Sequence, residues 1–154
     1  MCWQCDNPDG DYISHLLDVI EECGWAVSGV EASLTNRGWL HTVGLPAQYG
    51  HPELLIAGSS TDEQRVLNSI GAYIRDSGRK ISAGETMQLG DRVYGFAVVS
   101  RARRRAGEIG ASIETHRVLG ITKVEALEVI RMPLLERCDY HLDKALQELV
   151  SEGT

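Results

Sequence analysis

The sequence predicts an α+β fold, with a single mixed or antiparallel sheet of about five or six strands packed by three or four helices. Two segments, 12–23 and 61–77, carry apolar residues at helical spacing between capping residues. Four short apolar segments form two pairs around turns, namely 25–30 with 39–45 and 84–89 with 93–100. A length of 154 residues, with no internal repeat and no linker, predicts one domain over residues 1–154.

The first predicted elements are a helix and a β-hairpin. Residues 12–23 form an amphipathic pattern whose apolar members are Ile13, Leu16, Leu17 and Ile20. Asp11 is the predicted N-cap of this helix, and Gly24 is its predicted C′ residue. The next two apolar segments are separated by the turn sequence Asn36-Arg37-Gly38 and are therefore predicted to pair as a hairpin.

The middle of the chain is predicted to add a strand and a long helix. Residues 46–52 are rich in Pro and Gly and indicate a loop that leads into a short apolar strand at 54–57. Thr61 and Gln64 have the spacing of a capping box, in which two side chains satisfy each other's backbone amides. The helix that they start is predicted to end near Gly78.

The last part of the chain gives a mixed pattern. Gly90-Asp91-Arg92 is the predicted turn between the strands of the second pair. Residues 101–119 are basic and contain two glycines, and the one element they suggest is a short helix. Residues 124–130 favour a strand, although their composition also suits a helix. A closing helix is predicted at 139–150, with one apolar face formed by Leu142, Ala145, Leu146 and Leu149.

The acidic composition argues against two kinds of partner. Fifteen Lys and Arg against 22 Asp and Glu give a net charge of -7, which disfavours bulk nucleic-acid binding and association with an anionic membrane. The N-terminal segment 1–10 contains Asp6 and Asp9 and lacks the apolar core of a signal peptide. No apolar run approaches the roughly 20 residues that span a bilayer. We therefore expect a cytoplasmic protein, in which cysteines serve as metal ligands or thiols more often than as disulfides.

Two short spacings of metal-binding residues lie near the ends of the chain. Cys2 and Cys5 are separated by two residues, and so are Cys138 and His141. This spacing lets one turn direct two side chains at one ion, and three cysteines with one histidine form a common tetrahedral zinc set. The sequence thus predicts a structural zinc site that joins both termini. In the alternatives these residues bind no metal, or Cys23 completes a different site with the N-terminal pair.

A central stretch carries candidate acid–base residues. His41 and Thr42 lie near the end of a predicted strand, and His51 and Glu53 lie in and just after the loop that follows. Two imidazoles, a hydroxyl and a carboxylate are the groups of a general acid–base site or of a polar ligand pocket. In the alternative interpretation, His41 faces the sheet and residues 51–53 form a turn into a buried strand. No spacing between a nucleophile and a base decides between the two.

A cluster of basic residues forms the third candidate site. Four arginines occur within five positions, at Arg101, Arg103, Arg104 and Arg105. Guanidinium groups bind phosphates and carboxylates through paired hydrogen bonds, so the cluster is predicted to bind a small anionic ligand or an acidic partner protein. The alternative is an exposed loop whose charges face only solvent.

Several motifs lie in the first two thirds of the chain. They are Met1-Cys-Trp-Gln-Cys-Asp6, Trp39-Leu-His-Thr-Val-Gly-Leu45, Gly50-His-Pro-Glu-Leu54, Gly58, Leu67-Asn68, Gly78 and Gly84. Together they resemble an uncharacterised, mainly actinobacterial family of bacterial proteins that is classed as a domain of unknown function. The resemblance covers about residues 1–100, and it implies a shared structural or functional element made of Thr42, Gly44, His51, Pro52 and Glu53.

The resemblance brings no known activity, and it has two departures. The family usually has Tyr at the position of His41. It also supplies no counterpart of Cys138 and His141, which weakens the four-ligand zinc site specifically.

Two classes of function follow from these patterns. The first is a binding or interaction domain, with structural zinc and a partner or small anion held near His41, His51 and the arginine cluster. The second is a small enzyme, a hydrolase or a flavin-dependent oxidoreductase, in which His51 acts as acid or base and Glu53 and Thr42 assist. The sequence favours the first class, because no nucleophile, carboxylate pair or open metal site is evident. A homodimer is also predicted, since short strands leave a sheet edge to cover.

Overall fold

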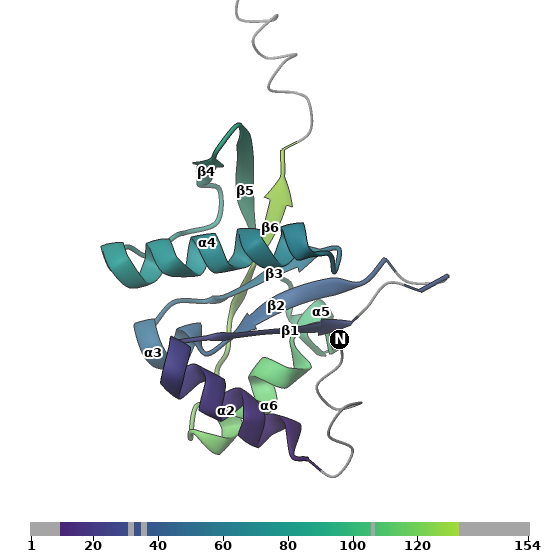
Figure 1. Ribbon diagram of the computed structural model, residues 1–154, viewed down its shortest axis with the longest axis vertical. Helices are drawn as coiled ribbons and strands as arrows, with labels where there is room; N and C mark the ends of the chain where they lie inside the picture. The colour runs from purple at the N-terminus through teal and green to yellow at the C-terminus, as the bar shows by residue number, and fades with distance from the viewer. Residues whose placement is uncertain (1–9, 31–32, 35–36, 106, 133–154) are drawn as a thin grey trace, which may run out of the picture.

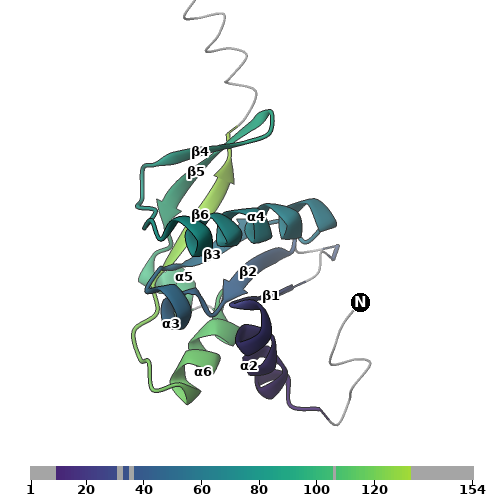
Figure 2. The same ribbon diagram turned by 60° about the vertical axis from the view of Figure 1, so that its left-hand side comes forward.

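The α+β prediction is confirmed. A computed structural model describes residues 10–30, 33–34, 37–105 and 107–132, and these form one mixed six-stranded sheet with helices on both faces (Figures 1 and 2). Five helices occur in this part of the chain, two of them only five residues long. The three or four predicted helices refer to the whole chain and include the one at 139–150, which lies outside the described residues.

The sheet has the strand order β1-β2-β3-β6-β5-β4. All neighbouring strands are antiparallel except β3 and β6, which are parallel and lie at the centre. The two predicted hairpins are confirmed as the pairs β1/β2 and β4/β5. The strands are β1 (Ala26–Val30), β2 (Trp39–Val43), β3 (Glu53–Ala57), β4 (Thr86–Leu89), β5 (Arg92–Val98) and β6 (Ala126–Arg131).

The helices begin and end close to where capping residues place them. They are α2 (Tyr12–Cys23), α3 (Leu45–Tyr49), α4 (Thr61–Ser77), α5 (Arg101–Arg105) and α6 (Gly110–Val118). For α2 the prediction is confirmed at both ends: Asp11 accepts a hydrogen bond from the Ile13 backbone N–H at 3.0 Å, and Gly24 ends the helix with a φ of 95°.

Several local predictions differ from the structure. The N-cap of α4 is Ser60 rather than Thr61, and the Ser60 hydroxyl donates to the Glu63 carboxylate. Part of the predicted loop at 46–52 is the helix α3, because proline is compatible with the first turn of a helix. The last strand begins at Ala126, two residues later than predicted. The predicted helix at 139–150 and residues 1–9 of the N-terminal segment lie outside the described residues.

Helix α4 covers one face of the sheet and α2 and α6 cover the other, as the two ribbon views agree (Figures 1 and 2). The core under α4 contains Leu54, Ile56, Leu67, Ile70, Ile74, Tyr94, Phe96, Leu127 and Val129. On the opposite face, α2 packs Leu16 and Ile20 against the first two strands, and a second cluster surrounds Leu55 and Ile109. The strands between these layers are therefore buried on both sides.

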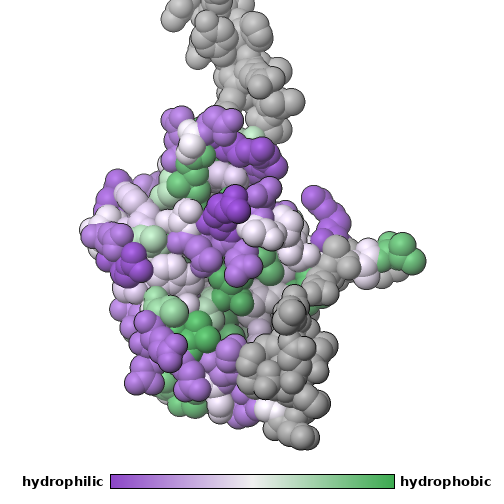
Figure 3. Space-filling view, in the orientation of Figure 1, coloured by the Kyte–Doolittle hydropathy of each residue, from purple (hydrophilic) through white to green (hydrophobic). Residues whose placement is uncertain are grey.

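The surface in Figure 3 is mainly polar, and its apolar residues form small separate clusters rather than one large patch. Among the helices that the structure describes, none is both long enough and apolar enough to cross a membrane.

Candidate functional site

A buried hydrogen-bond network surrounds Glu53, the first residue of β3. The Glu53 side chain is fully buried, and each carboxylate oxygen accepts two hydrogen bonds. Oε1 accepts from the Thr42 hydroxyl at 2.8 Å and from the Leu45 backbone N–H at 3.2 Å. Oε2 accepts from the Gly44 backbone N–H at 2.9 Å and from the Ser112 hydroxyl. The four donors come from β2, the turn after it, α3 and α6.

The turn after β2 depends on glycine at position 44. Gly44 has a φ of 121°, and this conformation lets two successive backbone amides face the same carboxylate. A Cβ at this position would lie 2.9 Å from Ile20 Cγ1 of α2, so there is also no space for a side chain. The Glu53 carboxylate thereby satisfies backbone donors where α3 begins.

Thr42 connects the network to the backbone of the sheet. Its hydroxyl donates to Glu53 and accepts a hydrogen bond from the Leu54 backbone N–H at 2.8 Å. A threonine hydroxyl has one donor and two acceptor positions, so both contacts are made at once. The predicted pair Thr42 and Glu53 is therefore in direct contact, and it fixes the junction of β2 and β3.

His116 of α6 lies next to the network and is fully buried. Its Nδ1 is 2.8 Å from the Ser112 carbonyl oxygen and 3.8 Å from Glu53 Oε2. A carbonyl oxygen only accepts, so Nδ1 carries the proton and Nε2 is the unprotonated nitrogen. Nε2 is buried and has no hydrogen-bond partner among the described residues. Burial lowers the pKa of His116, which favours this neutral form.

Burial also changes the protonation of Glu53. Removal from water raises the pKa of the Glu53 carboxyl to about 7, although the four hydrogen bonds, the one from Ser112 most, act in the opposite direction. Glu53 is therefore a carboxyl group that titrates near neutral pH while enclosed by protein.

The two predicted histidines make separate contacts. His41 is buried, its Nδ1 is 3.0 Å from the Thr42 carbonyl oxygen, and burial lowers its pKa to about 4. His51 donates from Nδ1 to the Pro52 carbonyl oxygen at 2.7 Å and accepts at Nε2 from the Ile81 backbone N–H at 2.9 Å. The Nε2 bond thus joins the residues just before β3 to the segment after α4, and neither bond of His51 reaches Glu53 or Thr42.

The four arginines of the predicted anion site have different surroundings. Arg103 donates to Glu108 at 3.0 Å and to Glu128 at 2.7 Å, and Arg104 donates to the Val124 carbonyl oxygen at 2.6 Å. Arg101 is exposed at the start of α5. The side chain of Arg105 is outside the described part of the structure. Two of the four guanidinium groups are therefore engaged within the protein.

The predicted zinc ligands Cys2, Cys5, Cys138 and His141 lie outside the described residues. Within the described ranges, no group of three or more His, Cys, Asp and Glu side chains is placed to hold a metal ion. Cys23, the alternative ligand, is a free and exposed thiol at the end of α2.

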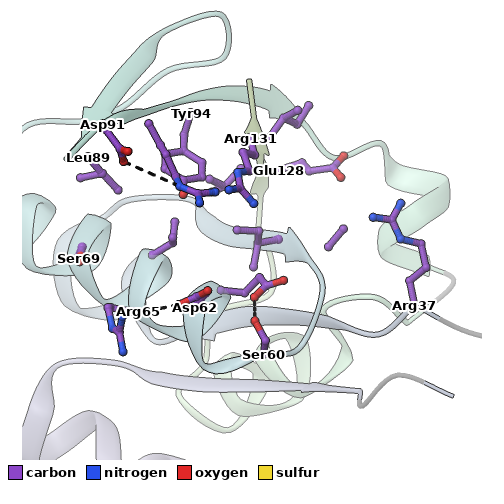
Figure 4. A pocket seen from close by; sticks show the side chains of 17 residues that line it. Arg37, Ser60, Asp62, Arg65, Ser69, Leu89, Asp91, Tyr94, Glu128 and Arg131 are labelled. Carbon is purple, nitrogen blue, oxygen red and sulfur yellow. Dashed lines mark hydrogen bonds and ion pairs between the residues drawn. The ribbon is translucent and has the colours of Figure 1, made fainter. Parts of the chain in front are cut away.

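A groove opens on the α4 face of the sheet (Figure 4). Its volume is about 710 Å³, and it lies between the first turns of α4 and the strands β3, β6, β5 and β4. The loop before β2 contributes Arg37, α4 contributes Arg65 and Ser69, and β5 and β6 contribute Tyr94 and Arg131. In Figure 4, Tyr94 and Arg131 line one side and the α4 residues line the other. This groove, unlike the Glu53 network, is open to solvent.

Most acidic groups of the groove already have partners. Asp62 lies 3.6 Å from Arg65, Asp91 lies 4.0 Å from Arg92, and Glu128 binds Arg103. Glu63 accepts a hydrogen bond from Ser60. In contrast, the side chains of Arg37 and Arg131 make no ion pair or hydrogen bond with another residue that the structure describes. The Arg37 and Arg131 side chains are therefore available to a ligand, although Glu63 is an acidic side chain of the groove whose partner, the Ser60 hydroxyl, carries no charge.

The groove and the partners of Glu53 on α6 are not among the sites predicted from the sequence. The buried face of α6 is polar, with Ser112, Thr115 and His116. The sequence of α6 therefore lacks the apolar residues at helical spacing that would predict a buried helix face. One feature of the sequence does point to the groove. Side chains alternate between the two faces of β6, so Arg131 lies on the same face as the core residues Leu127 and Val129.

Comparison with known proteins assigns a family. No curated protein and no solved structure matches the chain. A model of one protein family, described as a domain of unknown function, matches residues 19–131, from within α2 to the last residue of β6. The match includes Gly44, Glu53 and Ser112 of the buried network and every residue named in the groove. The chain therefore belongs to the DUF4262 family of domains of unknown function.

Proposed function

We propose that this protein is a binding domain whose ligand occupies the groove between α4 and strands β3 to β6. The observation that carries the proposal is the contrast between an open groove of about 710 Å³ and acid–base candidates that are enclosed by the fold. Small-molecule sites usually have volumes of roughly 300–1,000 Å³ and combine apolar walls with a few polar groups.

The burial of the acid–base candidates supports binding over catalysis. The exposed fractions of Thr42, Glu53, His41 and His51 are 0%, 0%, 3% and 2%. A general acid or base acts within hydrogen-bond distance of its substrate, directly or through one water. The hydrogen bonds of Glu53, Thr42 and His51 are instead made to other groups of the protein.

Filling the groove tests the proposal. Ser69→Trp places an indole in the groove from α4, and Glu21→Trp places the same side chain on the exposed surface of α2. We expect a soluble fragment library, screened by NMR chemical-shift changes, to give compounds that bind the wild type and Glu21→Trp but not Ser69→Trp. Compounds that bind Ser69→Trp as tightly as the wild type would place the ligand elsewhere and contradict the proposal.

We also propose the structural zinc site of Cys2, Cys5, Cys138 and His141. The spacing of the ligands supports it, and a closed set of four protein ligands would give the metal a structural role. Mass spectrometry of metals in protein purified without chelators should find about one zinc per chain. A Cys138→Ser, His141→Ala double variant should lose the metal and unfold at a lower temperature. Wild-type protein without metal would contradict the site.

A small enzyme is the second candidate function, and one observation favours it. The pKa of Glu53 is raised to about 7, a value that suits proton transfer near neutral pH. In this hypothesis, a hydrolase or a flavin-dependent oxidoreductase uses His51, Glu53 and Thr42, and α6 moves to admit the substrate. Yellow protein after purification would support the flavin form. Absence of bound flavin, with no hydrolysis of ester, amide or phosphoester substrates, would contradict the enzyme hypothesis.

A further inference from the structure

We propose that the groove recognises a small organic anion, whose phosphate or carboxylate group is bound by Arg92 and Arg131 and whose apolar part lies along the groove. This inference rests on the groove being the binding site proposed above. It differs from the sequence prediction of anion binding at Arg101–Arg105, because it uses arginines from the two strands β5 and β6.

The strand register brings these two arginines to one face of the sheet. Tyr94 of β5 is paired with Arg131 of β6, and directly opposed residues of antiparallel strands share a face. Arg92 lies two residues before Tyr94 and therefore shares that face as well. The two guanidinium groups are diagonal neighbours across the strand pair, a separation within reach of long side chains. Like charges at such positions repel each other unless an anion compensates them.

The end of β3 opens the groove beside Arg131. The pairing of β3 with β6 stops at Ile56 and Val129, whereas the pairing of β5 with β6 continues to Arg131. Beyond Val129, the side of β6 that faced β3 no longer has that strand beside it. Arg131 therefore lies in the part of the groove beyond the last paired residues of β3 and β6. Figure 4 shows its side chain next to Tyr94 within the groove.

Among the residues that the structure describes, no carboxylate forms an ion pair with Arg131, although Glu63 also lines the groove. Glu128 is held by Arg103 at 2.7 Å, and Asp62 lies 3.6 Å from Arg65. Asp91 is 4.0 Å from Arg92, and its side chain is 97% exposed, so this pair is weak. A phosphate or carboxylate can accept two parallel hydrogen bonds from each guanidinium group, which favours such an anion over the single distant carboxylate.

The apolar walls indicate an organic anion rather than a bare inorganic ion. Ile56, Val66, Leu89, Val129 and the Tyr94 ring line the groove together with the arginines. Burial of apolar ligand surface against these side chains adds affinity that an inorganic ion does not gain. The volume of about 710 Å³ also exceeds what one phosphate needs and suits a ligand of ordinary metabolite size.

Calorimetric titration with four probes tests the inference: inorganic phosphate, phenyl phosphate, benzoate and phenol. We expect phenyl phosphate or benzoate to bind more tightly than inorganic phosphate, and phenol not to bind. The tighter of the two organic anions identifies the preferred group as phosphate or carboxylate. Arg131→Gln and Arg92→Gln should each weaken binding at least tenfold. The control Arg117→Gln changes an exposed arginine of α6 outside the groove and should leave affinity within twofold.

Three results would overturn the inference. Anion binding that survives Arg131→Gln and Arg92→Gln but is lost in Arg101→Gln would move the site to α5. If none of the anions binds, while neutral fragments bind the wild type and not Ser69→Trp, the groove is a binding site but not one for anions. Failure of every anion and every fragment would contradict both this inference and the proposed function. Circular dichroism of each variant verifies that the fold is intact.

Discussion

At the scale of single residues, Gly44 and Glu53 depend on each other. The glycine adopts a positive φ that presents two backbone amides, and the carboxylate satisfies both in a place that water does not reach. The residues on either side of Gly44 or Glu53 in the sequence do not explain why a glycine or a glutamate is needed at that position. Their pairing gives a physical reason for a Thr-x-Gly segment followed by a buried glutamate.

Replacing Gly44 by alanine should therefore destabilise the protein. The new Cβ would strain a backbone with a φ of 121° and would approach Ile20 Cγ1 to 2.9 Å. We expect a loss of about 2 kcal/mol or more in the free energy of unfolding, measured by urea denaturation. Gly110→Ala is the matched control, because nothing lies within 4 Å of its Cβ position and it starts a helix. Equal stability of the two variants would contradict the role of Gly44.

The protonation of Glu53 should appear in the pH dependence of stability. Its pKa rises from 4.5 in the unfolded chain to about 7 in the fold, so this group's stabilising contribution is complete below pH 4.5 and is lost as the pH rises through 7. The change amounts to roughly 3 kcal/mol. His41 has the opposite sign: its pKa falls from 6.5 to about 4, so its contribution is present above pH 6.5 and is lost as the pH falls towards 4.

The contributions to the free energy of unfolding oppose each other between pH 4.5 and 7: Glu53 loses its contribution as the pH rises, whereas His41 gains, together with His51 and His116, whose pKa values burial also lowers. Glu53→Gln removes one of them, so its free energy of unfolding should rise with pH over this range. The variant should also be less stable at each pH, since an amide –NH₂ would face backbone and hydroxyl donors. Urea denaturation at four pH values measures both effects, with exposed Glu114→Gln as control. Parallel pH curves for Glu53→Gln and the wild type would contradict the raised pKa.

At the scale of elements, α5 is tied to the sheet by a bridging arginine. Arg103 contacts Glu108, which precedes α6, and Glu128 of β6. Arg103→Gln should reduce the free energy of unfolding by about 1 kcal/mol, and less at high salt, because the side chain is partly exposed. Arg101→Gln, at an exposed position of the same helix, should change it by less than about 0.5 kcal/mol. If the two substitutions lowered the free energy of unfolding equally, the contacts of Arg103 with Glu108 and Glu128 would not be what stabilises α5 on the sheet.

The elements that could be predicted from the sequence are those with local signals. Asp11 and Gly24 mark both ends of α2, and the glycine at position 90 with a φ of 64° marks the turn between β4 and β5. Helix α3 was predicted as a loop because Pro46 is usually read as a breaker, although the first turn of a helix accepts it. The Thr61-x-x-Gln64 pattern predicts Thr61 as the N-cap of α4, but Ser60, the residue before it, holds that position.

The candidate sites were less predictable because their residues are distant in the sequence. Thr42 and Glu53 were selected from their chemistry and are in contact, but Ser112 is 59 positions from Glu53 and lies on a helix with a polar buried face. The groove joins Arg37, Arg92 and Arg131, which only the sheet order brings together. A single sequence contains no information on that order beyond its hairpins.

At the scale of the whole molecule, the sheet has two outer strands, β1 and β4. Outer strands present backbone groups that can pair with another chain, which is the physical basis of the predicted homodimer. Light scattering after gel filtration should give twice the chain mass of 16.9 kDa. A mass of one chain over a hundredfold range of concentration would contradict the dimer. If the chains pair through β1, a groove-filling substitution should leave the mass unchanged, because the groove is lined by α4 and strands β3 to β6 and not by β1.

The separation of a buried polar network from an open groove is the central feature of the whole molecule. The network stabilises the β2–β3 junction and α6, and the groove on the α4 face is left to bind a ligand. One measurement tests this division most directly: the backbone amide chemical-shift map during titration with a fragment that binds. We expect the largest shifts at Ser69, Tyr94 and Arg131, and their loss in Ser69→Trp. The largest shifts at Gly44, Leu45 and Ser112, unchanged in Ser69→Trp, would contradict it and move the ligand to Glu53.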